Sequence, residues 1–165
     1  MDEEGFNPAM RLPAIAGLLL AISTVACGAH RIPGTDIPDN ADTRAIVAVI
    51  DSYRRAAEHR DAEGVLALVS QKYFDDAGTP DPADDIDYEQ LKKRISNDFK
   101  KLAALRLDIA VKSVNVEGDD ATAIVYYDAN YRITTREGEV GKKASDTHRM
   151  RFHREAGVWR FVSGL

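Results

Sequence analysis

The stretch that best indicates the fold is RMRFHREAGVWRFVS, at residues 149–163. Apolar and polar residues alternate on both sides of Ala156-Gly157, as they do in two half-buried strands that are joined by a tight turn. The end of the chain is therefore predicted to form a β-hairpin with one apolar face. If Ala156-Gly157 is a two-residue loop, that face carries two cross-strand pairs, Phe152 with Phe161 and Met150 with Ser163.

Longer strands are predicted before this hairpin, because alternation also marks residues 105–116 and 121–133 and resumes at 144. The phase of alternation shifts at Lys112-Ser113, which predicts a β-bulge. Glu137-Gly138 carries turn residues and is expected to be a second two-residue loop. This loop predicts four pairs: Val125 with Met150, Tyr127 with His148, Ala129 with Asp146 and Tyr131 with Ala144.

One face of these strands combines apolar residues with a polar group. Asp146 and His148 lie two residues apart on one strand, so the carboxylate could orient or charge the imidazole. Tyr127 and Tyr131 could donate hydrogen bonds to a carbonyl group. Alternatively, this half of the strand faces water, or the histidine is hydrogen-bonded within the core. The candidate pocket comprises Tyr127, Tyr131, Asp146, His148, Met150 and Phe152.

Three helices are predicted before the strands, because apolar residues recur there with the helical period. The second helix is short and follows Asp61, and the third follows Asp87, whose spacing to Gln90 is that of a capping box. In the first helix, at 42–60 with Asp42 as N-cap, the apolar face carries Ile46, Val49, Ile50, Tyr53 and Ala57.

Six aspartates lie in the segment 75–87, which has the sequence DDAGTPDPADDID. A calcium loop is one interpretation, but the glycine and the distal glutamate of an EF-hand are missing at the required offsets. A solvated loop that leads into a helix cap explains the segment better. We therefore predict no metal site and no cofactor.

The segment from Leu12 to Ala26 is uncharged, and it is too short for a comfortable membrane span, which needs about 20 residues. It suits the apolar region of a secretory signal, and a start at Met10 would give that signal the positive head formed by Arg11. Thr24-Val25-Ala26-Cys27 resembles the lipobox of bacterial lipoproteins, although leucine is usual where Thr24 stands. The resemblance implies cleavage before Cys27, which is the single cysteine of the chain, and lipidation of its thiol.

Residues 1–26 are therefore expected to be a lipoprotein signal peptide, and residues 27–41 the lipidated cysteine with a flexible tether. An acyl anchor would hold the domain at a membrane. In Gram-negative lipoproteins an aspartate after the cysteine often means inner-membrane retention. Gly28 stands there instead, so the resemblance implies the periplasmic face of the outer membrane if the host has one.

Two stretches of the remaining domain, residues 42–165, are similar to the nuclear transport factor 2-like superfamily, which includes SnoaL-like proteins. Residues 53–69 (YRRAAEHRDAEGVLALV) resemble its join between the first two helices, and residues 153–164 (HREAGVWRFVSG) resemble its terminal hairpin. The resemblance implies an α+β fold, in which three N-terminal helices wrap a bent antiparallel sheet into a cone with an apolar cavity. Some members of this superfamily are enzymes, and many only bind ligands or partners.

Two functions follow from these expectations. The first is a membrane-tethered envelope lipoprotein that binds a protein partner or a small apolar ligand without catalysis. The alternative is an isomerase or cyclase-like enzyme that uses Asp146 and His148 with Tyr127 and Tyr131. The net charge of −5 over 165 residues excludes a general nucleic-acid binder, which needs a basic surface. A homodimer is a further expectation.

Overall fold

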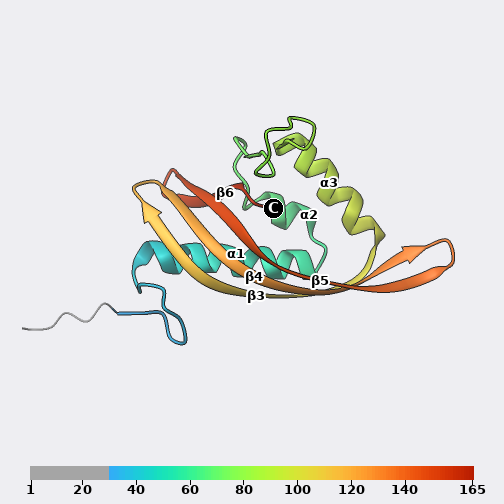
Figure 1. The fold of residues 1–165 in the computed structure, drawn as a ribbon, viewed down its shortest axis with the longest axis horizontal. Helices are drawn as coiled ribbons and strands as arrows, with labels where there is room; N and C mark the ends of the chain where they lie inside the picture. Colours follow the sequence, from blue (N-terminus) through green and yellow to red (C-terminus); the bar gives the residue numbers. More distant parts are fainter. Residues whose placement is uncertain (1–29) are drawn as a thin grey trace, which may run out of the picture.

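The computed structural model of the protein describes residues 30–165 and shows three helices followed by a strongly curved antiparallel sheet (Figure 1). The helices lie on the concave side of the sheet, which confirms the predicted α+β fold. None of the helices in this described part is long and apolar enough to span a bilayer. The helices are α1 (Ala41–Glu58), α2 (Ala62–Leu66) and α3 (Tyr88–Lys101).

The main sheet has four strands in the order β3-β4-β5-β6, each antiparallel to its neighbour. Two very short strands, β1 (Phe74–Asp75) and β2 (Ile86–Asp87), pair with each other at the ends of the acidic loop. The hairpin of β4 and β5 extends beyond the helices (Figure 1). The strands of the main sheet are β3 (Leu102–Glu117), β4 (Asp120–Thr135), β5 (Gly138–Glu155) and β6 (Val158–Ser163).

Two of the three predicted helix caps are confirmed, and one is wrong. Asp61 accepts a hydrogen bond from the Gly64 amide at the start of α2, and Asp87 forms the capping box with Gln90 at the start of α3. The N-cap of α1 is Asn40 rather than Asp42, because Asn40 forms a reciprocal capping box with Thr43.

Asp42 links α1 to the terminal hairpin. Its carboxylate accepts hydrogen bonds from the Arg154 guanidinium at 2.8 Å and from the Trp159 indole at 3.2 Å. The Arg154 guanidinium also lies over the Trp159 ring, 4.8 Å from its centre. These contacts fix the start of α1 on the concave side of the sheet.

The pairing of β4 with β5 is shifted by two residues from the prediction. The loop is Arg136-Glu137, and Thr135 pairs with Gly138. The Thr135 hydroxyl donates to the Gly138 carbonyl and accepts from the Glu137 amide, so it closes the turn one residue earlier than expected. A shift by two residues keeps each side chain on its predicted face of the sheet.

The new pairs place Ala123 opposite Met150 and Val125 opposite His148. The predicted bulge in β3 is confirmed by a register shift between Val111 and Ser113. A second irregularity, between Leu102 and Ala104, lies at the start of the same strand.

In the terminal hairpin, Phe152 pairs with Phe161 as predicted, and the centres of the two rings lie 4.6 Å apart. The predicted pair of Met150 with Ser163 is wrong, because a register shift beyond Phe152 places Arg151 opposite Ser163. Met150 and Phe152 are both buried. The core lies between the concave face and α1, where Ile46 and Ile50 are also buried.

Residues 31–38 differ from the flexible tether that was expected for 27–41. Arg31 and Pro38 form an antiparallel bridge, and the Ile32 amide donates to the Ile37 carbonyl. The Ile37 side chain is buried in the core, and this burial holds the turn against the domain. Cys27 and the predicted signal peptide lie outside the described residues.

Candidate functional site

A cavity of about 690 Å³ opens between the C-terminal half of α1, the end of α3 and the concave face of the sheet. This volume is within the usual range of sites for small molecules, about 300–1,000 Å³. The wall is mostly apolar and includes Phe99 from α3, Leu105 and Leu107 from β3, and Met150 from β5. The cavity is therefore suited to a small apolar molecule.

Three tyrosines from two elements line this cavity: Tyr53 from α1, and Tyr127 and Tyr131 from β4. The ring of Tyr53 packs edge-on against Phe161, with 5.7 Å between the ring centres. Among residues 30–165, no side-chain or backbone group forms a hydrogen bond with the Tyr53 hydroxyl. The Tyr53 hydroxyl is therefore available to a ligand.

Burial raises the pKa of Tyr53 above its ordinary value, and the neighbouring Tyr127 adds to the rise. The Arg94 guanidinium acts in the opposite direction. Tyr53 consequently stays protonated over the physiological pH range and can serve as a hydrogen-bond donor.

Four of the six predicted pocket residues line the cavity: Tyr127, Tyr131, His148 and Met150. Phe152 does not, because it is buried in the main core against Phe161. Asp146 is exposed and is absent from the wall. The predicted face of the sheet therefore does line a pocket, but Asp146 is not among the polar residues of its wall.

The structure does not pair Asp146 with His148. In the described part of the chain, the Asp146 carboxylate accepts one hydrogen bond, from the adjacent Thr147 amide at 2.7 Å, and none from the imidazole. Asp146 lies opposite Tyr127 on the neighbouring strand. His148 is exposed at the edge of the cavity, because β6 ends at Ser163 and does not cover this part of β5.

The mouth of the cavity carries charged side chains from α3 and β5. Asp98 and Lys101 lie near the end of α3, and their charged groups are 3.4 Å apart. Arg94 lies 4.0 Å from the same carboxylate. Lys142 reaches the mouth from β5, and it forms no ion pair with any residue from 30 to 165.

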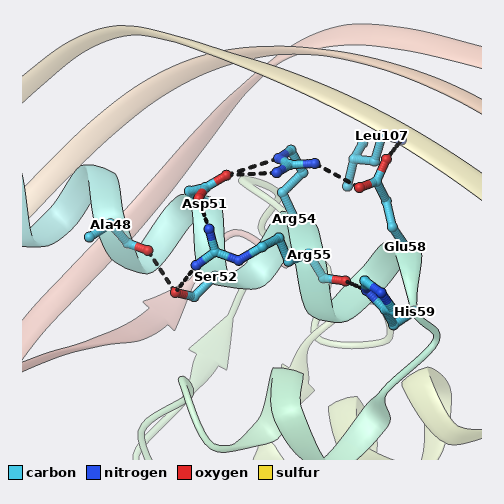
Figure 2. Close-up of polar contacts among 8 residues, drawn as sticks. All are labelled: Ala48, Asp51, Ser52, Arg54, Arg55, Glu58, His59 and Leu107. Atoms are coloured by element: carbon cyan, nitrogen blue, oxygen red, sulfur yellow. Dashed lines mark hydrogen bonds and ion pairs between the residues drawn. The ribbon is translucent and has the colours of Figure 1, made fainter.

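The C-terminal half of α1, which carries Tyr53, is fixed by polar contacts (Figure 2 shows the contacts of Arg54 and Glu58). The Glu58 carboxylate accepts from the Leu107 amide at 3.0 Å, on the edge of β3 that faces away from β4, and from Arg54 at 2.6 Å. Arg54 also donates to Asp51 at 3.0 Å. These contacts fix α1 along the free edge of β3.

Just beyond the end of α1, Arg60 donates to the carbonyl groups of Leu102 and Ala103, both at 3.0 Å. These carbonyls lie at the irregularity that begins β3. The two contacts place the junction of α3 and β3 beside the end of α1.

The floor of the cavity is completed by Gly164 and Leu165. Asp75 accepts from the Gly164 amide at 2.7 Å, and the Tyr73 hydroxyl accepts from the Leu165 amide at 2.9 Å. Gly164 has a φ of 92°, and a side chain there would collide with the Arg149 carbonyl oxygen. A glycine is thus required where this segment passes β5.

Tyr53, Phe99 and Lys142 also line the cavity, although the sequence did not predict them there. Tyr53 was predicted only as a member of the apolar face of the first helix, and both Tyr53 and Phe99 contact the sheet through long-range packing. A tyrosine on an otherwise aliphatic helix face was the available signal, because a buried hydroxyl usually has a polar partner.

A second hollow, of about 730 Å³, lies between the turn at residues 32–37 and β3 residues 109–112. Its wall includes Thr35 and Asp36 of the turn and the exposed Lys112. It contains no aromatic side chain and lies apart from the candidate residues. The cavity behind Tyr53 is the better candidate site.

Comparison with known families gives the same fold. The sequence profile described as SnoaL-like domain matches residues 46–164, which is most of the chain. The chain belongs to the SnoaL-like domain family. No curated protein sequence matches it.

Solved structures that resemble this SnoaL-like domain share its fold at low sequence identity. A conserved protein from Planctomyces limnophilus DSM 3776 is 14% identical with a TM-score of 0.64, and the match covers 75% of this chain and 93% of the other. A protein of the NTF2-like family from Streptomyces avermitilis is 16% identical with a TM-score of 0.56, covering 74% and 93%. A ketosteroid isomerase-like protein from Erwinia carotovora atroseptica SCRI1043 is 17% identical with a TM-score of 0.60, covering 76% and 95%. These likenesses define the fold and assign no reaction.

Proposed function

We propose that this SnoaL-like domain binds a small, largely apolar molecule in the cavity behind Tyr53, without converting it chemically. The observation that carries the proposal is the Tyr53 hydroxyl in a mostly apolar wall, where no group of residues 30–165 forms a hydrogen bond with it. The hydroxyl is accessible in the cavity, since no buried side-chain oxygen of the described residues lacks a partner, and a ligand with a hydrogen-bond acceptor can bind it there. The favoured ligand therefore combines an apolar body with a carbonyl-type oxygen.

The binding function is favoured over the isomerase or cyclase alternative by the position of Asp146. Acid–base catalysis requires proton-transferring groups in reach of the substrate, usually with a partner that orients them. Among the described wall residues the one side-chain carboxylate is Asp98, which is paired with Lys101, and His148 has no hydrogen-bonded carboxylate. The tyrosines supply hydrogen-bond donors, which binding also needs.

The binding proposal is tested with 2-acetylnaphthalene, a neutral probe that has an apolar ring system and a ketone oxygen. Calorimetric titration of the full-length protein should show saturable binding. Ala129→Leu should weaken that binding at least about tenfold, because the larger side chain would occupy the cavity beside Leu107.

Ala110→Leu is the matched control, because Ala110 is exposed on the opposite face of the sheet. It should leave the affinity unchanged. Absence of binding to the wild type, or equal affinity in both variants, would contradict the proposal.

We further propose that the domain is held at the cell envelope by a lipid on Cys27. The support is the sequence: an uncharged apolar segment, a lipobox-like Thr24-Val25-Ala26-Cys27, and the position of the single cysteine. Cys27→Ala should release the protein from the membrane fraction or leave the signal uncleaved. A cleaved Cys27→Ala protein that remains membrane-bound would refute the anchor.

A further inference from the structure

The charges at the mouth of the cavity are unevenly distributed. Asp98 is shared between Lys101 and Arg94, so its negative charge is already compensated on α3. Lys142 reaches the cavity from β5 and has no ion pair within residues 30–165. The described mouth thus carries an uncompensated ammonium group next to an apolar interior.

Other carboxylates near Lys142 do not neutralise it. Asp146 lies four residues away along β5, a separation of about 13 Å in an extended strand. Glu139 lies in an ion pair with Arg132, with 3.3 Å between the charged groups. Lys142 is therefore available to a group that enters the cavity from solvent.

Polar groups inside the cavity are also suited to an anion. Tyr131 lies directly opposite Lys142 on β4, so the phenol and the ammonium group flank the same part of the mouth. Both donate hydrogen bonds, and a carboxylate accepts them.

We infer that the natural ligand is an amphipathic carboxylate, with its apolar body in the cavity and its carboxylate at Lys142. This inference rests on the proposed binding function and adds the charge of the ligand. The apolar wall binds the body, and Lys142 with Tyr131 binds the head group at the mouth. The head group keeps contact with water, so its ionic attraction is weakened by salt.

The test compares two probes of similar shape, 2-naphthoate and the neutral 2-acetylnaphthalene, by calorimetric titration of the full-length protein. At low ionic strength 2-naphthoate should bind about five- to tenfold more tightly. The preference should shrink as salt is added, because the exposed charges are screened.

Lys142→Gln should abolish the preference for 2-naphthoate while it leaves the affinity for the ketone unchanged. Lys143→Gln is the matched control, because Lys143 is the next residue on β5 and points to the other face of the sheet. It removes the same charge but should retain the preference. Unchanged thermal unfolding would show that both variants are folded.

The outcomes separate the two proposals. Equal affinity for both probes, or equal loss of preference in the Lys142 and Lys143 variants, would overturn the carboxylate inference and leave the binding function intact. Failure of both probes to bind would overturn both proposals.

Discussion

Tyr53 shows how one position combines a structural and a functional role. Its ring packs against Phe161 in the core, whereas its hydroxyl lies in the wall of the cavity. The ring contributes apolar burial, and the hydroxyl has no partner among the described residues. The two roles can therefore be separated by removing the hydroxyl alone.

Tyr53→Phe should weaken binding of 2-acetylnaphthalene about fivefold, because one hydrogen bond to the ketone is lost. The free energy of unfolding should stay within about 0.5 kcal/mol of the wild type, since no internal hydrogen bond is broken. Tyr126→Phe, on the exposed outer face, is the control and should change neither quantity. Full affinity in the Tyr53 variant would show that the hydroxyl does not contact the ligand.

Gly164 is a second position at which the structure of the site depends on one residue, because only a glycine fits where this segment passes β5. Gly164→Ala should lower the free energy of unfolding by more than about 1 kcal/mol, because φ is positive and the new Cβ meets the Arg149 carbonyl. Gly141→Ala, which has open space and no positive φ, should change it far less. Urea unfolding of both variants measures the difference, and equal stability would contradict the close approach at Gly164.

At the scale of elements, the position of α1 determines the shape of the cavity. Glu58 binds the exposed edge of β3, and Arg60 binds the irregularity at its start (Figure 2 shows the Glu58 contacts). Edge amides are otherwise left to solvent or to another chain. The helix therefore both covers one edge of the sheet and supports the wall that carries Tyr53.

Glu58→Ala should lower the free energy of unfolding by about 1–2 kcal/mol, because the Leu107 amide and Arg54 both lose their acceptor. Hydrogen exchange of the Leu107 amide should also become faster. Glu137→Ala, in the exposed turn between β4 and β5, is the control and should leave both unchanged. Slow exchange at Leu107 in the Glu58 variant would refute this role.

Local features of these elements could be predicted from the sequence, and long-range ones could not. The cap at Asp87, the bulge after Val111 and the pair of Phe152 with Phe161 depend on neighbouring residues, and all three are confirmed. The β4–β5 loop was misplaced because the Thr135 hydroxyl closes the turn. The burial of Ile37 depends on contacts with distant parts of the chain.

In the candidate site, too, local features could be predicted from the sequence and long-range ones could not. Strand alternation placed Tyr127, Tyr131, His148 and Met150 on one face, and all four line the cavity. The short β6 leaves Asp146 exposed, and the alternation pattern cannot show where a neighbouring strand ends. Tyr53 enters the site because α1 crosses the concave face, which is a property of the tertiary structure.

At the scale of the whole molecule, the buried Tyr73 and the partly buried Tyr53 make stability depend on alkaline pH. Burial raises the pKa of Tyr73 well above its ordinary value, and burial also raises that of Tyr53. The folded state then holds these protons more tightly than the unfolded chain. Their contribution to stability is complete below the unfolded pKa of about 10 and declines as the pH rises beyond it.

The free energy of unfolding should therefore fall between pH 9 and pH 11, values chosen to bracket the ordinary tyrosine pKa of about 10. Tyr73→Phe should flatten this decline, whatever its effect at neutral pH. Urea unfolding across the pH series measures both slopes. Parallel slopes in the two proteins would show that Tyr73 does not cause the decline.

The central claim is that a small apolar molecule binds inside the cone, between α1, α3 and the sheet. The most direct measurement is the set of intermolecular NMR contacts between 2-acetylnaphthalene and the methyl groups of the full-length protein. Contacts are expected to Met150, Leu105 and Leu107 in the cavity wall. Contacts confined to the exposed Val140 and Val158, or no contact to any cavity methyl group, would contradict it.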